Sequence, residues 1–207
     1  MDNKETQRKI FQYRNDKFET PDLQRQRVEI VFKTLRPYFK RRVLDIGAGH
    51  GEMVKILRGK GYAVEGMDIN PNELVQEGNF TKLPDKEYDT VVCSHIIEHM
   101  TDEELALGFS EIKRVLIGKL IIATPYDEDL DRLICPLCRI HLYGHRRSFT
   151  RESMTLLLEG FGFRVVKIKV IPIIKFRLPY IPTWILMLPD NLIGLQKNLL
   201  VVAEKAK

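Results

Sequence analysis

The sequence contains few cysteines and no long apolar run. Three cysteines in 207 residues are too few for the disulfide framework of a small secreted domain. No apolar run reaches the roughly 18–20 residues of a membrane-spanning helix, and the longest candidate, residues 181–188, is interrupted by Pro182 and followed by Pro189. The first residues are polar and form no signal-peptide core. We therefore expect a cytoplasmic protein without a transmembrane segment.

A strong excess of charge of one sign is also missing. The net charge is +5 with a pI near 9.0, in a chain that is 44% hydrophobic and 29% charged. This modestly basic balance is typical of a solvated globular surface, and it leaves a nucleic-acid or acidic headgroup partner open but not favoured, because no aromatic-rich basic patch accompanies it. The length predicts a single domain over residues 1–207.

The most informative stretch that is present runs from Val43 to Gly51 and reads Val-Leu-Asp-Ile-Gly-Ala-Gly-His-Gly. It predicts a buried strand, a glycine turn and a helix N-terminus, where backbone N–H groups can approach a ligand. The next predicted strand ends at Asp68, where a carboxylate can accept hydrogen bonds from ribose hydroxyls. Together these features predict a nucleotide-binding site.

This arrangement resembles the nucleotide-binding half of class I S-adenosylmethionine-dependent methyltransferases, in the group that includes the ubiquinone-biosynthesis-like enzymes. A nicotinamide dinucleotide-binding domain is the alternative, but the chain has Glu52 where that fingerprint requires glycine, and an anion suits a pyrophosphate poorly. The resemblance implies an α/β, Rossmann-like fold. It has a seven-stranded sheet, mostly parallel with an antiparallel strand 7, and helices on both faces.

The resemblance also implies the cofactor-binding residues for S-adenosylmethionine. Asp68 would bind the ribose, Ile69 would lie against the adenine, and Asp45 would reach the methionine amino group. The family usually places an acid near the adenine amino group, but here Asn79 occupies that position, so the adenine contact is shared between Asn79 and the Phe80 backbone. The predicted set is Asp45, Gly47, Ala48, Gly49, Asp68, Ile69, Asn79, Phe80, Ser94 and His95.

Residues 95–99 read His-Ile-Ile-Glu-His and resemble a family block beside the reactive sulfonium. His95 is a candidate general base, because an imidazole titrates near neutral pH, although no catalytic residue is assigned firmly. The spacing is not H-E-x-x-H. The family resemblance already accounts for Glu98 and His99, and it implies a structural role for them that holds the loop.

A possible zinc site follows the strand predicted over residues 119–124. Two residues separate Cys135 from Cys138, and three residues separate His141 from His145. These ligand types and sequence spacings are ones that zinc sites use. The alternative is a pair of buried or free cysteines with a histidine used elsewhere, and a redox dithiol is less favoured because no thioredoxin-like context surrounds the cysteines. His145 also begins a stretch, residues 145–150, that resembles a His-x-Arg-x-Phe-Thr segment of the family.

The predicted organisation has four parts. Residues 1–41 form a helical arm over the site, with a first helix around 9–18 carrying Tyr13, Arg14 and Phe18, and a second that starts at Thr20-Pro21 and ends at Pro37. Residues 42–124 form the cofactor-binding half, with a helix from Thr101 closed by Gly118 and a strand over 119–124. Residues 125–150 form the Cys/His-containing insertion. Residues 151–207 form the C-terminal half, in which the apolar loop 171–195 could cap the pocket, form a dimer interface or make weak membrane contact.

The predicted function is methyl transfer from S-adenosylmethionine to an unidentified acceptor. No Asn-Pro-Pro-Tyr-like block, the mark of many amino-group methylases, follows strand four, which favours a small-molecule acceptor. An RNA-modifying or RNA-binding protein that uses the basic arm and the Cys/His knuckle is the alternative, and an NAD-dependent oxidoreductase is a weaker one. The sequence leaves the oligomeric state and the acceptor atom open.

Overall fold

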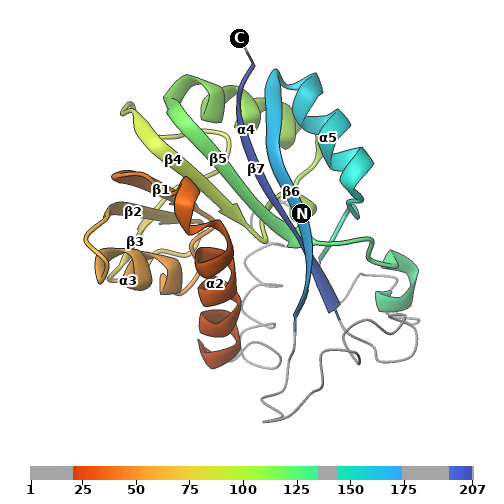
Figure 1. Ribbon diagram of the computed structural model, residues 1–207, viewed down its shortest axis with the longest axis horizontal. Coiled ribbons are helices and arrows are strands. Elements are labelled where there is room, and N and C mark those ends of the chain that lie inside the picture. The colour runs from red at the N-terminus through yellow and green to blue at the C-terminus, as the bar shows by residue number, and fades with distance from the viewer. Residues whose placement is uncertain (1–20, 135–143, 174–195, 207) are drawn as a thin grey trace.

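A computed structural model describes residues 21–134, 144–173 and 196–206. They form one seven-stranded sheet in the order β3-β2-β1-β4-β5-β7-β6, with helices on both faces (Figure 1). The Rossmann-like architecture predicted from the sequence is confirmed, including the antiparallel strand β7 between β5 and β6. The predicted first helix of the arm and most of the apolar loop 171–195 lie outside the described residues.

The centre of the sheet is parallel and buried. Strands β1 (Arg42–Ile46), β2 (Ala63–Asp68), β4 (Tyr88–Ser94) and β5 (Leu116–Pro125) pair in parallel. They contain nearly continuous apolar runs because helices cover both of their faces. Because these strands are parallel, their carboxyl ends meet at one edge of the sheet, where parallel α/β sheets bind ligands.

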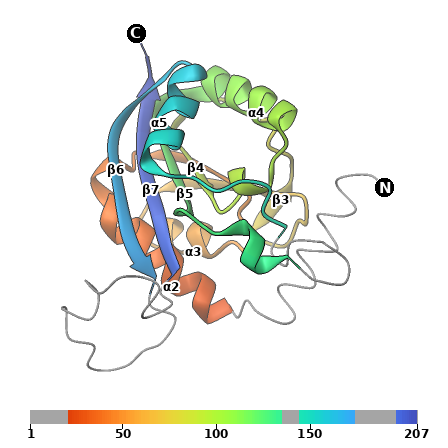
Figure 2. The ribbon, with the colours of Figure 1, turned by 90° about the vertical axis from the view of Figure 1, so that its right-hand side faces the viewer.

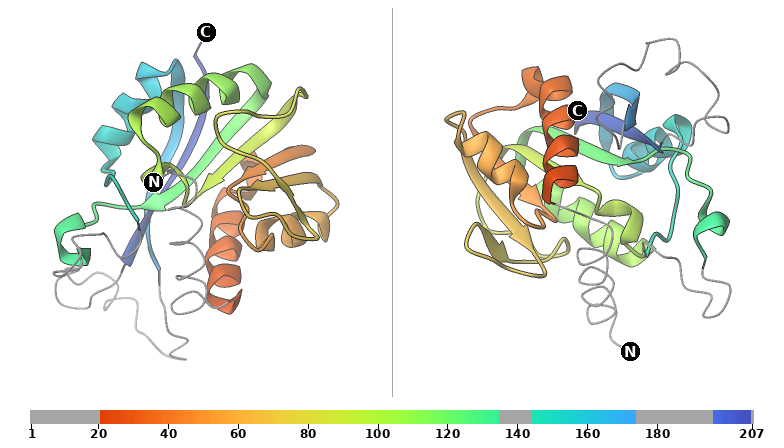
Figure 3. Two further views of the ribbon diagram at one scale, coloured as in Figure 1. Left: turned by 180° about the vertical axis from the view of Figure 1, so that it is seen from behind. Right: turned by 90° about the horizontal axis from the view of Figure 1, so that it is seen from below.

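Within the described residues, two helices cover each face of the sheet. Helices α2 (Pro21–Leu35) and α3 (Glu52–Arg58) pack on one face, and α4 (Asp102–Val115) and α5 (Arg151–Gly160) pack on the other, as the rear view shows (Figure 3). A 3₁₀ turn, η1 (Arg36–Tyr38), follows α2 at the predicted Pro37 stop. The apolar face of α2 packs on the sheet, since Val28, Val31, Phe32 and Leu35 are buried.

One helix boundary differs from the prediction. Gly118 does not close the helix that begins at Thr101, because α4 ends at Val115 and β5 already starts at Leu116. Gly118 instead lies inside the strand, where an added Cβ would be 2.2 Å from the carbonyl oxygen of Asp89. The glycine is therefore required by close backbone packing against β4, not by a helix end.

The second half of the sheet ends in a long antiparallel pair. Strands β6 (Phe163–Ile173) and β7 (Gln196–Lys205) run side by side along one edge (Figure 2). No helix among the described residues is long and apolar enough to cross a membrane.

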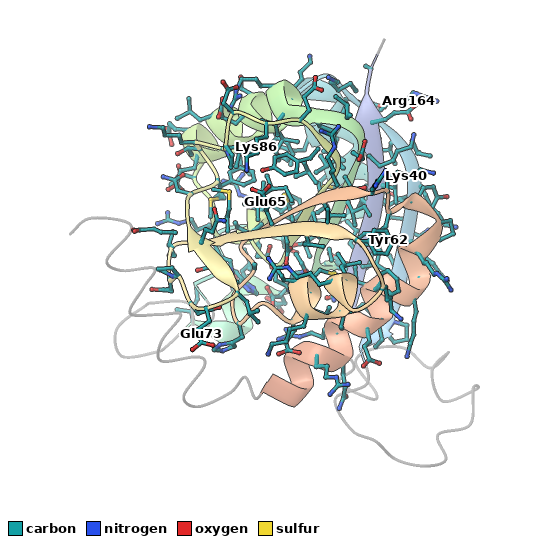
Figure 4. The ribbon with its side chains drawn as sticks, turned by 90° about the vertical axis from the view of Figure 1, so that its left-hand side faces the viewer. Lys40, Tyr62, Glu65, Glu73, Lys86 and Arg164 are labelled. Carbon is teal, nitrogen blue, oxygen red and sulfur yellow. The ribbon has the colours of Figure 1, made fainter. Side chains whose placement is uncertain are left out.

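At the opposite edge, the connection between β2 and β3 (Val75–Glu77) is unusually short. Only residues 69–74 separate two parallel strands, where a helix is the usual crossover. Glu65 of β2 binds Lys86 at 3.1 Å, and the two lie together on this face in Figure 4. Glu65 also accepts a hydrogen bond from the Tyr88 hydroxyl. These contacts tie the edge of the sheet to the segment that precedes β4.

Candidate functional site

A pocket opens at the carboxyl ends of β1, β2 and β4. Its cavity volume is about 180 Å³. All ten residues predicted to bind the cofactor line this pocket, which are Asp45, Gly47, Ala48, Gly49, Asp68, Ile69, Asn79, Phe80, Ser94 and His95. We call residues 45–53, 67–69 and 78–81 its glycine side, and residues 94–104 with 144–145 its histidine side.

The glycine side depends on backbone conformations that only glycine adopts without strain. Gly47 has φ of +72° and Gly51 has φ of +77°. An added Cβ at Gly47 would also lie 2.8 Å from Cδ1 of Ile96 on the histidine side. The N–H groups of Gly47 and Ala48 both donate to the carbonyl of Met67. The turn is therefore closed on β2, and it begins α3 next to the pocket.

Asp68 holds the two loops of the glycine side together. Its Oδ2 accepts from the N–H of Gly49 at 3.0 Å, and its Oδ1 accepts from the N–H of Asn70 at 2.9 Å. Burial raises the pKa of Asp68, although these backbone donors oppose the rise. A third backbone N–H, that of Ile69, also bonds this carboxylate, and because a carboxylate has about four acceptor sites, it can still accept from a ligand hydroxyl.

The pocket is rich in carboxylates. Asp45, Asp68 and Glu52 all line it, and all three are buried. Burial and the nearby Asp68 raise the pKa of Asp45 to about 8. A cationic ligand would favour the ionised form of Asp45, whereas an anionic pyrophosphate would favour its protonated form and would be repelled by the ionised carboxylates.

Arg27 is the one lysine or arginine that lines the pocket within the described residues. It comes from α2, together with the buried Val28. The arm was predicted to lie over the site through its first helix, but Tyr13, Arg14 and Phe18 lie outside the described residues. Arg27 was missed because it stands at the margin of an apolar helix face, where a basic residue usually faces solvent.

Asn79 is oriented by its own turn. Its Oδ1 accepts at 2.6 Å from both the N–H and the hydroxyl of Thr81. The amide nitrogen of Asn79 is then the group that can serve a ligand, as a donor. This differs from the acid that the family usually has here, which can only accept. The next residue, Phe80, is buried edge-on against Phe109 of α4.

His95 begins the histidine side in a strained conformation. Its φ is +55°, which is uncommon for a residue other than glycine. Its Nε2 lies 3.1 Å from the amide nitrogen of Asn198 in β7, and its Nδ1 lies 3.3 Å from Oε1 of Glu98. Both ring nitrogens are thus held by neighbours. To accept a proton from a substrate at Nε2, the ring has to exchange its contact with Asn198.

Glu98 is a buried carboxylate surrounded by three histidines. It lies in η2 (Ile97–His99) and is 1% exposed. Burial opposes its charge, but contact with His95 and the positive charges of His95, His99 and His145 outweigh burial and lower the pKa of Glu98 to about 2. Neither of its oxygens accepts a hydrogen bond of good geometry from a described residue.

The segment from Gly144 to Phe149 is fastened onto the histidine side. The N–H of Arg146 donates to the carbonyl of Glu98, and the N–H of Asp127 donates to the carbonyl of Phe149. The Arg147 guanidinium donates to the carbonyl of Met100 at 2.7 Å and pairs with Asp102. These bonds bring the end of the predicted insertion against a loop about 45 residues earlier in the chain.

Of the predicted zinc ligands, only His145 is described, since Cys135, Cys138 and His141 lie outside the described residues. The His145 ring is buried and contacts the Glu128 carboxylate through Nδ1. Glu128 lies two residues before the first residue of the 3₁₀ turn η3 (Leu130–Leu133). The His145 ring also lies edge-on to the His99 ring, with 4.8 Å between their centroids. His145 therefore lies beside Glu98 and His99, which the sequence analysis had not connected with it.

A family model described as a methyltransferase domain matches residues 7–168. The match covers most of the chain, including both sides of the pocket. The chain belongs to this methyltransferase family. The protein is thus an enzyme with methyltransferase activity, and the resemblance stated from its sequence is confirmed. None of the curated proteins matches the sequence.

Solved structures support the same fold. A SAM-dependent methyltransferase from Archaeoglobus fulgidus is 25% identical, with a TM-score of 0.62 over 87% of this chain and 94% of that one. The 1,6-didemethyltoxoflavin-N1-methyltransferase of Burkholderia thailandensis, with bound substrate and S-adenosylhomocysteine, is 16% identical, with a TM-score of 0.68 over 99% and 87% of the two chains. The magnesium protoporphyrin IX methyltransferase of Synechocystis PCC 6803, with bound S-adenosylhomocysteine, is also 16% identical, with a TM-score of 0.61 over 96% and 92%. These matches give no support to the RNA or the nicotinamide alternative.

Proposed function

We propose that this methyltransferase binds S-adenosylmethionine on the glycine side of its pocket and transfers the methyl group to a small-molecule acceptor on the histidine side. The observation that carries the proposal is the convergence of all ten predicted residues on one pocket at the carboxyl ends of β1, β2 and β4. Relatives of the same fold carry S-adenosylhomocysteine, the product of that cofactor.

The charges of the pocket suit this cofactor. S-adenosylmethionine has a sulfonium and an ammonium group, and the buried carboxylates of Asp45, Glu52 and Asp68 line the pocket around it. Opposite charges at short range in a buried site attract strongly. In this arrangement Asp45 serves the ammonium group, Arg27 of α2 serves the carboxylate, and Asp68 accepts from the ribose hydroxyls through its remaining lone pairs.

The adenine end is bound by Ile69, Asn79 and Phe80. Because Oδ1 of Asn79 is occupied by Thr81, its amide nitrogen donates to a ring nitrogen of adenine. The backbone N–H of Phe80 is a second donor. Donors at both positions favour acceptor atoms on the purine ring, so discrimination of adenine from other bases rests on ring nitrogens more than on the exocyclic amino group.

Ser94 and His95 lie at the end of β4 and mark where the methyl group meets its acceptor. Methyl transfer needs the acceptor atom in line with the carbon–sulfur bond, and an enzyme contributes chiefly by positioning and by exclusion of water. The acceptors named for two relatives, 1,6-didemethyltoxoflavin and magnesium protoporphyrin IX, are small molecules. A small molecule that reaches the pocket past Ile96 and Met100 fits the lining of the histidine side.

Calorimetric titration of the full chain with S-adenosylmethionine and, separately, with NAD tests the proposal. We expect one equivalent of S-adenosylmethionine to bind and NAD to give no heat. Binding of NAD alone would overturn the proposal. A screen of small acceptors with methyl-labelled cofactor then identifies the substrate class. An RNA arm belongs in the same screen, because RNA affinity that falls steeply with salt would favour the RNA alternative.

A further inference from the structure

The strongest unassigned feature of the molecule is the cluster of Glu98, His99 and His145. One ligand atom from each of these side chains lies within 4.8 Å of the others. Glu98 and His145 are buried, and His99 is partly buried. Two imidazoles and one carboxylate form a frequent ligand set for catalytic zinc and other divalent transition metals. We propose that these three side chains bind one divalent transition-metal ion at the edge of the pocket.

The hydrogen bonds around the two histidines support this proposal independently. Nδ1 of His99 lies 3.2 Å from the carbonyl oxygen of Gly144, and Nδ1 of His145 contacts the carboxylate of Glu128. A carbonyl and a carboxylate only accept, so each neutral ring carries its hydrogen on Nδ1 and its lone pair on Nε2. Histidines that bind metals are typically oriented in this way by a carbonyl or carboxylate behind the ring.

Glu98 supplies the charge of the site. It is 1% exposed, and although Nδ1 of His95 lies 3.3 Å from its Oε1, neither oxygen accepts a well-formed hydrogen bond from a described residue. A buried carboxylate normally has such partners, because leaving an acceptor unsatisfied is costly. A bound cation would satisfy both oxygens. Metal–ligand bonds of about 2.0–2.2 Å need ligand atoms roughly 3.3 Å apart, so the ligand atoms, now within 4.8 Å of one another, have to move closer when the ion binds.

The three ligands leave coordination positions open. His99 and its neighbour Gly144 line the pocket, whereas Glu98 and His145 are not among the lining residues. A metal held by these residues therefore presents its open positions toward the histidine side of the pocket, where the acceptor binds in the proposed function. Three protein ligands with an open position are the arrangement of a catalytic metal, whereas structural sites are closed by four.

The metal site also bears on the methyl acceptor, an extension that rests on the proposed function. It makes the acceptor a compound with a hydroxyl group. A metal-bound hydroxyl loses its proton to solvent more readily, because the cation stabilises the oxyanion. The oxygen lone pair then forms the new carbon–oxygen bond while the carbon–sulfur bond breaks. The bonding pair stays on sulfur, and S-adenosylhomocysteine leaves as a neutral thioether.

The test separates this site from the zinc knuckle predicted by the sequence, because His145 belongs to both. Metal-free full-length protein is titrated with Zn²⁺ by calorimetry, as wild type, Glu98→Gln, His99→Ala and a Cys135→Ser/Cys138→Ser double variant. Exposed Glu87 provides the matched control, Glu87→Gln. We expect one equivalent of zinc in wild type, a loss of affinity of about 100-fold or more in Glu98→Gln and His99→Ala, and unchanged binding in the double variant and the control.

Loss of binding in the cysteine variant with retention in Glu98→Gln would overturn the proposal, as would wild type that binds no zinc. Circular dichroism confirms that each variant is folded. Co²⁺ gives a second readout that does not depend on affinity, because a thiolate ligand adds sulfur-to-metal charge-transfer absorption that a His/His/Glu site lacks. Zinc binding in a protein that fails to bind S-adenosylmethionine would leave the metal site standing and remove the proposed function. With both in place, the metal should accelerate methylation of hydroxyl acceptors and not of amines.

Discussion

The glycine side and the histidine side of the pocket are built in different ways. On the glycine side, the key groups come from two short segments that end neighbouring parallel strands, and Asp68 joins them by backbone hydrogen bonds to Gly49 and Asn70. On the histidine side, η2 meets a segment about 45 residues further along the chain. Local sequence therefore encodes one side, and long-range packing assembles the other. Substitutions can test this difference.

The largest effect is expected for Asp68→Ala. The variant loses a charged acceptor for the ribose and also frees the loop N–H groups of Gly49 and Asn70. Hydrogen bonds to charged groups contribute about 1.5–3 kcal/mol each, so affinity for S-adenosylmethionine should fall by about 100-fold or more. Calorimetry measures the change. Asp68→Asn keeps one acceptor oxygen, so its affinity should lie between those of wild type and Asp68→Ala. An unchanged affinity in both variants would show that the ribose binds elsewhere.

Asp45 should make cofactor binding depend on pH. Its pKa is raised to about 8 from 3.8 by burial and by Asp68, so the cofactor-free protein carries it protonated at pH 6. A cationic cofactor favours the carboxylate, and binding then releases a proton. Affinity should rise with pH up to about 8, by at most about tenfold per unit.

Without cofactor, the stability of the folded protein should change with pH in the opposite direction to cofactor affinity. The stability that neutral Asp45 contributes is fully present below pH 3.8 and is lost as the pH rises to about 8. Asp45→Asn should flatten both profiles. Calorimetry in two buffers of different ionisation enthalpy counts the released protons, and a count of zero in wild type at pH 6 would contradict this assignment.

Gly47→Ala should affect both sides at once, because its new Cβ meets Ile96. The left-handed φ of +72° costs an alanine about 1–2 kcal/mol, and the 2.8 Å contact with Ile96 adds to this. Urea unfolding should show the loss. In an Ile96→Ala background the contact component should disappear while the φ component stays. Equal losses in both backgrounds would show that the two sides do not press on each other here.

The smallest effect is expected for Arg147→Met on the histidine side. The variant loses the bond to the Met100 carbonyl, while the pair with Asp102 contributes little because that carboxylate is largely exposed. Stability should fall by about 1 kcal/mol, and affinity for S-adenosylmethionine should stay within about twofold. A large loss of cofactor affinity would mean that the glycine side depends on long-range packing after all.

The glycine turn and the strand end at Asp68 carried the family resemblance, which implied a seven-stranded sheet with an antiparallel last strand and ten cofactor-site residues, all of which line the pocket. The motif could be found because strand, glycine turn and helix follow one another within a few residues, so periodicity and turn chemistry act locally. Gly118 was assigned wrongly as a helix end for the same reason. Glycine is required at position 118 because the backbone of Asp89 in β4 lies against it. No local sequence pattern reports such a contact between two strands.

Only the folded chain could reveal the relation of His145 to Glu98 and His99. By spacing, His145 belongs with the cysteines that precede it, and Glu98 with a loop that needs no metal. Backbone hydrogen bonds from Arg146 to Glu98 and between Phe149 and Asp127 bring the two segments together. A ligand set drawn from segments far apart in the chain depends on where each loop leaves the sheet, which the packing of η2, β5 and the segment before α5 decides.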